Sequence, residues 1–469
     1  MTAPEPTLRD RAILSLACCG SFVVILDATI VSVALPDIRS ALDMTSSTLP
    51  WVVNAYTLAF AGFLLLGGRL SDRYGQRRMF MLGMVVFTLA RAAAGLADAT
   101  WLLLAARAIQ GLGGALLMPV TLSLLTTRFT TPTARAKALG TWSAVGAVAA
   151  ASGPVIGGIL TQWTGWRSVF LISLPVGVAA VVAGARLPRA TALRDRSRVD
   201  VVGAAIATTG LVGTVYAVMR TATVGWTDAT VLLPLAGGVA LLGLFGWHQA
   251  GWARDPLVPL GIFRARAVSS GNTVMFLLGL GFFASPVLLS LYLQDVHGYS
   301  PFGAGMAYLP IGVAMFVGAQ SAGRLLVRVG ARRASVWCCG IATVGFAGVA
   351  AVAAARLDQP LWMLLPGVVF GFGAAASFTP VTVVATSSVP PRHNGVAAGL
   401  LNTVRQTSAA IGLGALSTVT AVVGATWHAA HPRSDATAAL AHGYTAAFAA
   451  SAGCLLVAAI AAAWAMPRR

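Results

Sequence analysis

Residues 68–78 read GRLSDRYGQRR, and residues 323–333 read GRLLVRVGARR. Seven of the eleven positions are identical, at an offset of 255 residues. Each copy follows a long apolar run and carries arginines on both sides of a glycine. An internal repeat at this distance predicts a chain that is built from two related halves.

The composition around this repeat places the chain in a membrane. Of the 469 residues, 57% are hydrophobic and only 10% are charged, against roughly 25% charged in a typical soluble domain. So few charges cannot cover the surface of a soluble enzyme of this length, and a disordered chain needs low hydrophobicity. The runs 81–89 and 171–182 do not alternate in polarity as the strands of a membrane barrel do. We therefore predict an all-α integral membrane protein.

The sequence divides into fourteen apolar segments, each close to the roughly 20 residues that a spanning helix needs. They are 12–36, 47–68, 79–97, 101–127, 135–160, 166–187, 199–219, 229–250, 267–293, 302–327, 334–355, 360–387, 394–423 and 440–465. The repeat pairs the second span with the tenth, so spans 1–6 correspond to spans 9–14. We expect an N-terminal six-helix half at 1–187, a linker with two inserted helices at 188–255, and a C-terminal six-helix half at 256–469.

The excess of basic residues follows this topology. The chain has 32 Lys and Arg against 14 Asp and Glu. With an even number of spans, 24 of the basic residues fall on the side that holds both termini, five fall on the other side, and Arg91, Arg107 and Arg405 lie within spans. By the positive-inside rule both termini are cytoplasmic. Because the charges are dispersed by topology and form no patch, we predict no nucleic-acid partner. The preference for arginine, 31 to one lysine, suggests a GC-rich bacterial genome and hence the bacterial inner membrane.

One carboxylate, Asp27, lies deep within a span. A charge at that depth costs at least about 2.5–3.5 kcal/mol on insertion scales, so it needs a partner or a proton. Burial disfavours the charged form of a carboxyl group, which makes Asp27 a candidate for binding and releasing protons. Arg107 is always charged and must pair or face water. Arg91 lies near the outer end of its span, where we interpret it as a side chain that reaches the membrane interface.

Several motifs accompany the repeated loop in a fixed order. They are LDATIVSVALP (26–36), WVVNAY (51–56), RAIQGLGGA (107–115), GPVIGG (153–158) and AGLLNTVRQTSAAIG (398–412). Together with 68–78 they resemble the signatures of the major facilitator superfamily, and in particular those of its fourteen-helix drug:proton antiporters. The resemblance covers essentially the whole chain and implies the major facilitator fold. The chain departs from the pattern at Ala149, where a glycine is usual, and it has no acid deep in a span of the second half.

The resemblance also implies roles for individual residues. It places Arg107 near Asp27 as the pair that couples transport to protons. It makes the first loop a latch that closes the cytoplasmic side in the outward-open state, through Gly68, Asp72, Arg73, Gly75, Arg77 and Arg78. It makes Gly153, Pro154, Gly157 and Gly158 the antiporter motif of the fifth span. The kink and small side chains there predict a close helix–helix seam.

Polar side chains within apolar spans are candidates for the substrate cavity. They are Asn54, Tyr56, Gln110, Asn272, Gln320, Asn402 and Arg405. Except for the arginine, side chains of these kinds more often form hydrogen bonds between helices than contacts with a ligand. For Arg405, a local backbone carbonyl is as good a partner as a substrate.

These observations lead us to expect a proton-coupled efflux antiporter that exports small amphipathic drugs, antibiotics or toxic metabolites by alternating access. The alternatives are a proton-linked exporter or symporter of one native metabolite and, outside transport, a membrane receptor or sensor. The chain contains no HExxH, GxSxG or ATP-binding loop, so we expect neither an enzyme nor a nucleotide-driven pump. We expect no catalytic residues, no metal and no cofactor beyond the proton gradient, and a monomer in the lipid bilayer. The five cysteines lack the spacing of a zinc site.

Overall fold

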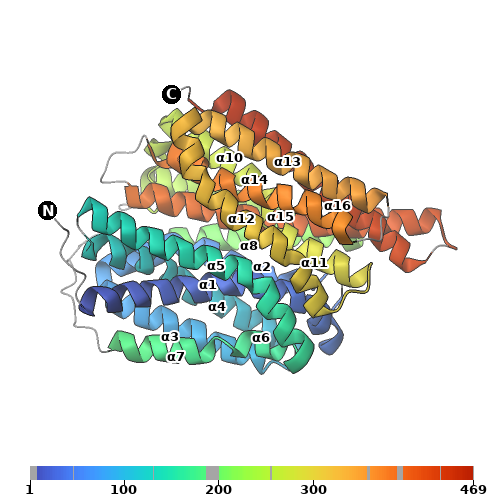
Figure 1. Cartoon of the computed structure of the whole chain (residues 1–469), viewed down its shortest axis with the longest axis horizontal. Helices are drawn as coiled ribbons and strands as arrows, with labels where there is room; N and C mark the ends of the chain where they lie inside the picture. Colours follow the sequence, from blue (N-terminus) through green and yellow to red (C-terminus); the bar gives the residue numbers. More distant parts are fainter. Residues whose placement is uncertain are drawn as a thin grey trace.

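The computed structural model describes residues 8–45, 47–129, 131–185, 200–253, 256–355, 360–387, 394–433 and 435–467. Regular structure in these ranges is helical. Figure 1 shows two layers of helices: α1, α3, α4, α5 and α7 lie in one, and α10, α12, α13, α14 and α16 lie in the other. We call the end where α1 begins and α16 ends the inner end, predicted to face the cytoplasm, and the opposite end the outer end.

The helices follow the predicted order. The N-terminal group is α1 (Leu8–Ala41), α2 (Trp51–Tyr74), α3 (Gln76–Gly95), α4 (Thr100–Arg128), α5 (Pro132–Thr164), α6 (Arg167–Leu171) and α7 (Leu174–Ala185). The inserted group is α8 (Val201–Val224), α9 (Ala229–Trp247), a π-helical turn (His248–Trp252) and a 3-10 turn (Leu260–Arg264). The C-terminal group is α10 (Arg266–Phe282), α11 (Ser285–Asp295), α12 (Pro301–Val329), α13 (Ala331–Ala354), α14 (Pro360–Ser387), α15 (Asn394–Ala430) and α16 (Ala436–Ala465).

Thirteen segments of the described chain are long and apolar enough to span a membrane. This is one fewer than expected, because only the stretch Trp51–Leu64 of α2 is counted as an apolar helix and it is short. Two predicted spans are broken helices. The sixth divides into α6 and α7 and the ninth into α10 and α11. Pro175 and Pro286 follow the two breaks, and proline cannot donate the backbone hydrogen bond that would continue the helix.

The repeat is visible in the backbone. Gly75 joins α2 to α3 with φ 91°, and Gly330 joins α12 to α13 with φ 80°. The two glycines are 255 residues apart, the offset of the sequence repeat. Left-handed backbone of this kind favours glycine, which has no Cβ to clash. Helix packing is repeated as well, since α2 and α3 pack on α4 while α12 and α13 pack on α14.

The two halves meet mainly along three pairs of helices, α5 with α12, α2 with α15, and α1 with α11. The inserted helix α8 packs on both α2 and α15 and covers that pair. Gly62 of α2 faces Thr208, and Thr418 of α15 donates a hydrogen bond of 3.1 Å to the carbonyl of Val218. One inserted helix therefore contacts both halves.

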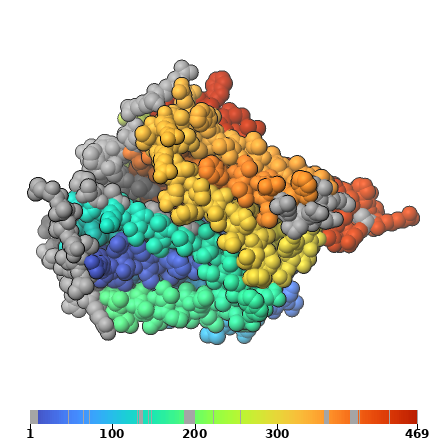
Figure 2. All heavy atoms as spheres, in the orientation of Figure 1, coloured from blue at the N-terminus to red at the C-terminus, as the bar shows by residue number. Residues whose placement is uncertain are grey.

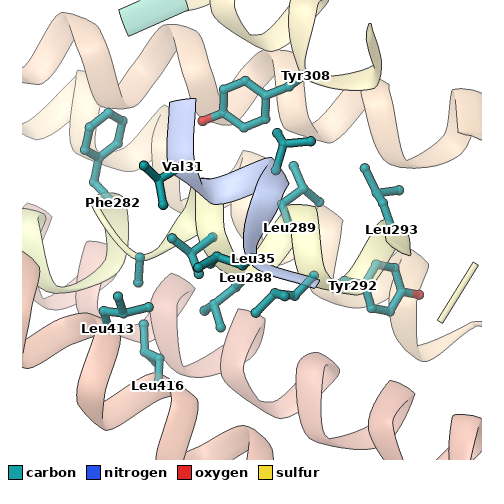
Figure 3. Close-up of a cluster of buried hydrophobic side chains, with 14 of the residues drawn as sticks. Val31, Leu35, Phe282, Leu288, Leu289, Tyr292, Leu293, Tyr308, Leu413 and Leu416 are labelled. Atoms are coloured by element: carbon teal, nitrogen blue, oxygen red, sulfur yellow. The ribbon is translucent and has the colours of Figure 1, made fainter. Parts of the chain in front are cut away.

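The outer end is closed between the halves. Val31 and Leu35 of α1 lie in a buried cluster with Phe282, Leu288 and Leu289 (Figure 3). Beyond this cluster, Arg39 donates hydrogen bonds of 2.8 and 3.3 Å to the two carboxylate oxygens of Asp295. Tyr444 of α16 donates to the same carboxylate at 3.3 Å. An apolar cluster and an ion pair thus join the halves at the outer end.

The halves separate toward the inner end along α5 and α12. A Cβ at Gly312 of α12 would touch Ala151 of α5, and these two helices meet on the face shown in Figure 2. Two and three turns further along the same side of α12, Ala319 and Gly323 are exposed. A Cβ at Gly323 would meet nothing within 4 Å. The structure is therefore closed at the outer end and open between α5 and α12 at the inner end.

A polar cluster anchors the inserted helices at the inner end. Asp200 accepts hydrogen bonds from the backbone of Gly203 at 2.8 Å, from Gln249 at 2.6 Å and from His248 at 3.0 Å. Burial of the Asp200 carboxyl opposes ionisation, but the hydrogen bonds from Gly203, Gln249 and His248 outweigh it and hold its pKa below the usual range. The predicted linker before Asp200 lies, at residues 186–199, outside the described residues.

Candidate functional site

The centre of the N-terminal half holds a buried group of charges. Asp27 of α1 has an exposed fraction of 0%, and so has Arg91 of α3, while that of Arg107 in α4 is 1%. One oxygen of the Asp27 carboxylate accepts from Arg91, and the other accepts from Arg107 at 2.6 Å. The structure thus brings Asp27 and Arg107 together, as the resemblance implies.

The sequence-based interpretation of Arg91 is wrong. Its guanidinium does not reach the membrane interface, because α6 and α7 pack against α3 on that side. Besides Asp27, it donates to the carbonyl oxygens of Val169 at 2.5 Å and Phe170 at 3.0 Å. These carbonyls are free because α6 ends at Leu171, and the last carbonyls of a helix have no partner within it. The break after α6 therefore supplies the acceptors that hold Arg91.

Arg107 is held from three sides. It donates to the carbonyl oxygen of Val52 at 2.8 Å and to the side-chain oxygen of Gln110 at 2.8 Å, one turn along α4. Its guanidinium lies over the ring of Tyr56, 4.7 Å from the ring centre, which is close enough for a cation–π interaction. Two of the predicted cavity residues, Gln110 and Tyr56, thus belong to this charged group.

The arrangement pairs one carboxylate with two guanidinium groups in a place that water does not reach. Breaking a buried ion pair by removing one partner costs about 3–5 kcal/mol, because the other charge is left without compensation. Each arginine also donates to carbonyl or amide oxygens, so neither guanidinium depends on Asp27 alone for its hydrogen bonds.

The glycines of the fifth predicted span make α5 a junction with two neighbours. A Cβ at Gly153 would lie 1.9 Å from the hydroxyl of Thr29, and one at Gly157 would lie 2.4 Å from the carbonyl oxygen of Ile30. A Cβ at Gly158 would lie 2.5 Å from the carbonyl oxygen of Pro301 in α12. The close seam expected of this motif is present, both between α5 and α1 and between α5 and α12. On α1, the contacts at Thr29 and Ile30 lie within one turn of Asp27.

A comparison with known families identifies this architecture. The model described as Major Facilitator Superfamily matches residues 17–413. The chain belongs to the major facilitator superfamily. Major facilitators are transporters, so the chain is a multi-pass membrane transporter and not an enzyme.

Relatives within the superfamily are similar over most of their length. The chain is 39% identical over 412 residues to a cephamycin export protein of Amycolatopsis lactamdurans, covering 87% of this chain and 84% of the relative. It is 36% identical over 464 residues to a puromycin resistance protein of Streptomyces alboniger, covering 97% and 91%. Among solved structures, an auto-inhibited peptide transporter of the POT family superimposes with a TM-score of 0.71 at 16% identity, covering 97% and 96%. This last likeness supports the major facilitator fold alone.

The loop that is typical of major facilitators contacts the end of α7 and the segment that follows the inserted helices. Arg77 donates to the carbonyl oxygens of Gly184 and Ala185 at the end of α7. Arg69 donates at 3.1 Å to the carbonyl of Pro256, which follows the inserted helices. The remaining loop residues differ: Arg73 and Arg78 are exposed, Gly75 provides the left-handed turn, Gly68 faces Pro119 of α4, and the side chain of Asp72 lies outside the described residues.

Two other predicted cavity residues are buried between helices of this major facilitator. The amide nitrogen of Asn54 lies 3.4 Å from the sulfur of Met219 in α8, so Asn54 faces the inserted helix. Asn272 in α10 donates at 2.8 Å to the carbonyl of Val268. The side-chain oxygens of both asparagines are buried without a hydrogen-bond partner.

The last three candidates occupy different positions. Gln320 is exposed and continues the stripe of Val313 and Val317 on α12. Both valines line an apolar groove of about 740 Å³ together with residues of α13 and α14, and Gln320 is not among the residues that line it. Asn402 is half-buried in α15. Arg405 is half-buried as well, and its Nε is buried without a partner.

The residues that sequence reasoning missed are Arg91 and the carbonyls of Val169 and Phe170. The sequence does hold a signal for them, an arginine inside an apolar span and a proline that breaks the sixth span. Within the described ranges, no three His, Cys, Asp or Glu side chains come together as a metal site would require.

Proposed function

We propose that this major facilitator exports small amphipathic antibiotics or toxic metabolites in exchange for protons. The observation that carries the proposal is the buried Asp27, whose carboxylate is shared by Arg91 and Arg107. A carboxylate buried in a transporter span is a functional site by default, and proton relays use such groups. The two arginines stabilise the charged form of Asp27 in one conformation. In another conformation, a proton that binds Asp27 would displace a hydrogen bond from one of the arginines.

The printed names of the relatives support the substrate class. The cephamycin export protein and the puromycin resistance protein cover most of this chain at 39% and 36% identity. Their compounds are chemically unlike each other, so the names favour the class of antibiotics and do not select one compound.

The proton step would involve this chain's own residues in a fixed order. When the outer end opens, a proton binds an oxygen of Asp27 and displaces one guanidinium hydrogen bond. Arg91 then keeps the carbonyls of Val169 and Phe170, and Arg107 keeps Val52 and Gln110. When the inner end opens, the proton leaves to the cytoplasm and the ion pairs form again. Closure at the outer end, as in the structure, is the conformation that this second stage requires.

The seam around α5 would carry the conformational change. Asp27 lies on α1, and the next turn of α1, at Thr29 and Ile30, touches the glycines of α5. The same helix α5 touches α12 of the other half at Gly158. A shift of α1 upon protonation of Asp27 is therefore transmitted to the contact between the halves.

The experiment is transport into inside-out vesicles with an imposed pH gradient, using a panel of antibiotics. The wild type should accumulate at least one of them and release protons from the vesicle lumen as it does so. Asp27→Asn keeps the size of the side chain and should abolish uphill accumulation. The matched control is Asp37→Asn. Asp37 lies ten residues further along α1, outside the charged group.

Two results would contradict the proposal. The first is uphill export by a well-expressed Asp27→Asn variant, which would remove the coupling role. The second is accumulation that proceeds with the gradient in the opposite direction, which would make the chain a proton-linked symporter.

A further inference from the structure

A third arginine lies within the membrane-spanning part of the chain, in the other half. Arg405 belongs to α15 and lies eleven residues after Asn394, where that helix begins. At 1.5 Å per residue this is about 16 Å along the helix axis. The pair of arginines at Asp27 lies in the N-terminal half, so Arg405 is a separate feature.

The position of Arg405 on α15 directs it to the interior of the C-terminal half. Leu401, one turn before it, packs with Val274 of α10 and Val381 of α14. Ser408, almost one turn after it, faces Gly279 of α10 so closely that a Cβ on that glycine would overlap the hydroxyl. Residues three and four apart share a face of a helix. Arg405 therefore faces α10 and α14, away from lipid.

Within the described part of the chain, no acid forms an ion pair with Arg405. Nε of Arg405 is buried without a hydrogen-bond partner. The acids described in the C-terminal half, Asp295 and Asp435, lie at the outer end, where Asp295 binds Arg39 and Asp435 caps α16. Arg91 and Arg107, by contrast, share Asp27.

An uncompensated cation at this depth is unfavourable for folding. The effective penalty for removing an ion from water is several kcal/mol in real proteins, and intramembrane arginines generally mark substrate pathways. Arg405 as a whole residue is half-buried, although its Nε is buried without a partner. The structure is open at the inner end, the side from which an exported molecule enters.

We propose that Arg405 binds an acidic group of the transported molecule, and that the substrates of this carrier include amphipathic carboxylic acids. The planar guanidinium donates two parallel hydrogen bonds to a carboxylate, which a lone lysine cannot do. The buried Nε is one donor of that pair. The inference rests on the proposed export function, and it adds the charge of the substrate.

The test measures binding and transport separately. A panel of aromatic carboxylic acids, each paired with its methyl ester, is added to the purified full-length protein, and thermal stabilisation reports affinity. In the wild type we expect at least one acid to bind about ten times more tightly than its ester. Arg405→Gln should remove this difference, Arg405→Lys should retain part of it, and Arg433→Gln, an exposed arginine in the loop before α16, should leave it unchanged.

The outcomes distinguish this inference from the proposed function. The inference fails if no acid is preferred over its ester, or if the preference survives in Arg405→Gln. It also fails if acid and ester weaken by the same factor, as a purely structural role predicts. Acid preference that depends on Arg405, in a protein that shows no gradient-driven transport, supports the inference and contradicts the export function.

Discussion

Replacing Arg91 tests whether the buried charges act as one unit. Arg91→Gln removes one of the two cations at Asp27 while keeping a polar side chain of moderate length. The shorter amide cannot reach Asp27, Val169 and Phe170 together, which Arg91 does with three separate nitrogen atoms. Asp27 then depends on Arg107 alone.

The size of the effect follows from these contacts. Removing one partner of a buried ion pair costs about 3–5 kcal/mol. Asp27 keeps its bond of 2.6 Å to Arg107, which reduces the loss, while each carbonyl left without a donor adds about 1–3 kcal/mol. We therefore expect Arg91→Gln to lower the free energy of unfolding by about 3–5 kcal/mol.

The pH dependence of transport separates a coupling role from a structural one. With one counter-charge gone, a proton on Asp27 displaces fewer hydrogen bonds, so the protonated form should persist to higher pH. The pH profile of antibiotic uptake into inside-out vesicles should move toward higher pH in Arg91→Gln and less in Arg91→Lys. Arg433→Gln serves as the control for expression and for loss of a surface charge.

The reasoning fails if the Arg91→Gln variant has wild-type thermal stability and an unchanged pH profile. An altered stability with an unchanged profile would make Arg91 a structural residue only.

Three further changes probe other parts of the structure. Gly158→Val should reduce transport at least tenfold without loss of expression, because a Cβ there would lie 2.5 Å from the carbonyl oxygen of Pro301; wild-type rates would exclude the seam as a moving contact. Arg39→Gln removes the ion pair with Asp295, so a cysteine placed at Val31 should react faster with an impermeant maleimide added from outside; equal rates would show that the apolar cluster closes the outer end by itself. Asp200→Ala removes a helix cap and should cost about 0.5–2 kcal/mol at neutral pH. Because the pKa of Asp200 is lowered in the folded state, this difference should be present above its unfolded value of about 3.9 and disappear as the pH falls through the folded value; a difference that persists in acid would contradict the role of the charge.

Much of the fold could be predicted from the sequence, because lipid leaves few solutions for an apolar chain. Continuous apolar runs give helices, and the repeat gives two halves. The breaks in the sixth and ninth spans were not predicted, although Pro175 and Pro286 were present in the sequence. A proline within a spanning helix produces either a kink or a break, and neighbouring helices decide which one forms.

The candidate site was predicted in part. Asp27 and Arg107 stood out because charges in spans are rare, and the structure brings them together. Arg91 was misread because its distance from the end of α3 says nothing about α6 and α7, which cover that end. Asn54 shows the same limit, since its neighbour Met219 is 165 residues away in the inserted helix α8. Sequence gives the depth of a residue in the membrane, and packing gives the side to which it points.

The matched glycines Gly75 and Gly330 show which part of the repeat is the same in both halves. At the offset of the repeat the two copies differ in charge: Asp72 corresponds to Val327, and Asp27 corresponds to Phe282. The left-handed turn remained in both copies. A backbone conformation that only glycine adopts easily tolerates no gradual replacement, whereas a charge can be lost in one half once the other half supplies it. The duplicated scaffold is thus free to become asymmetric in chemistry while it stays symmetric in shape.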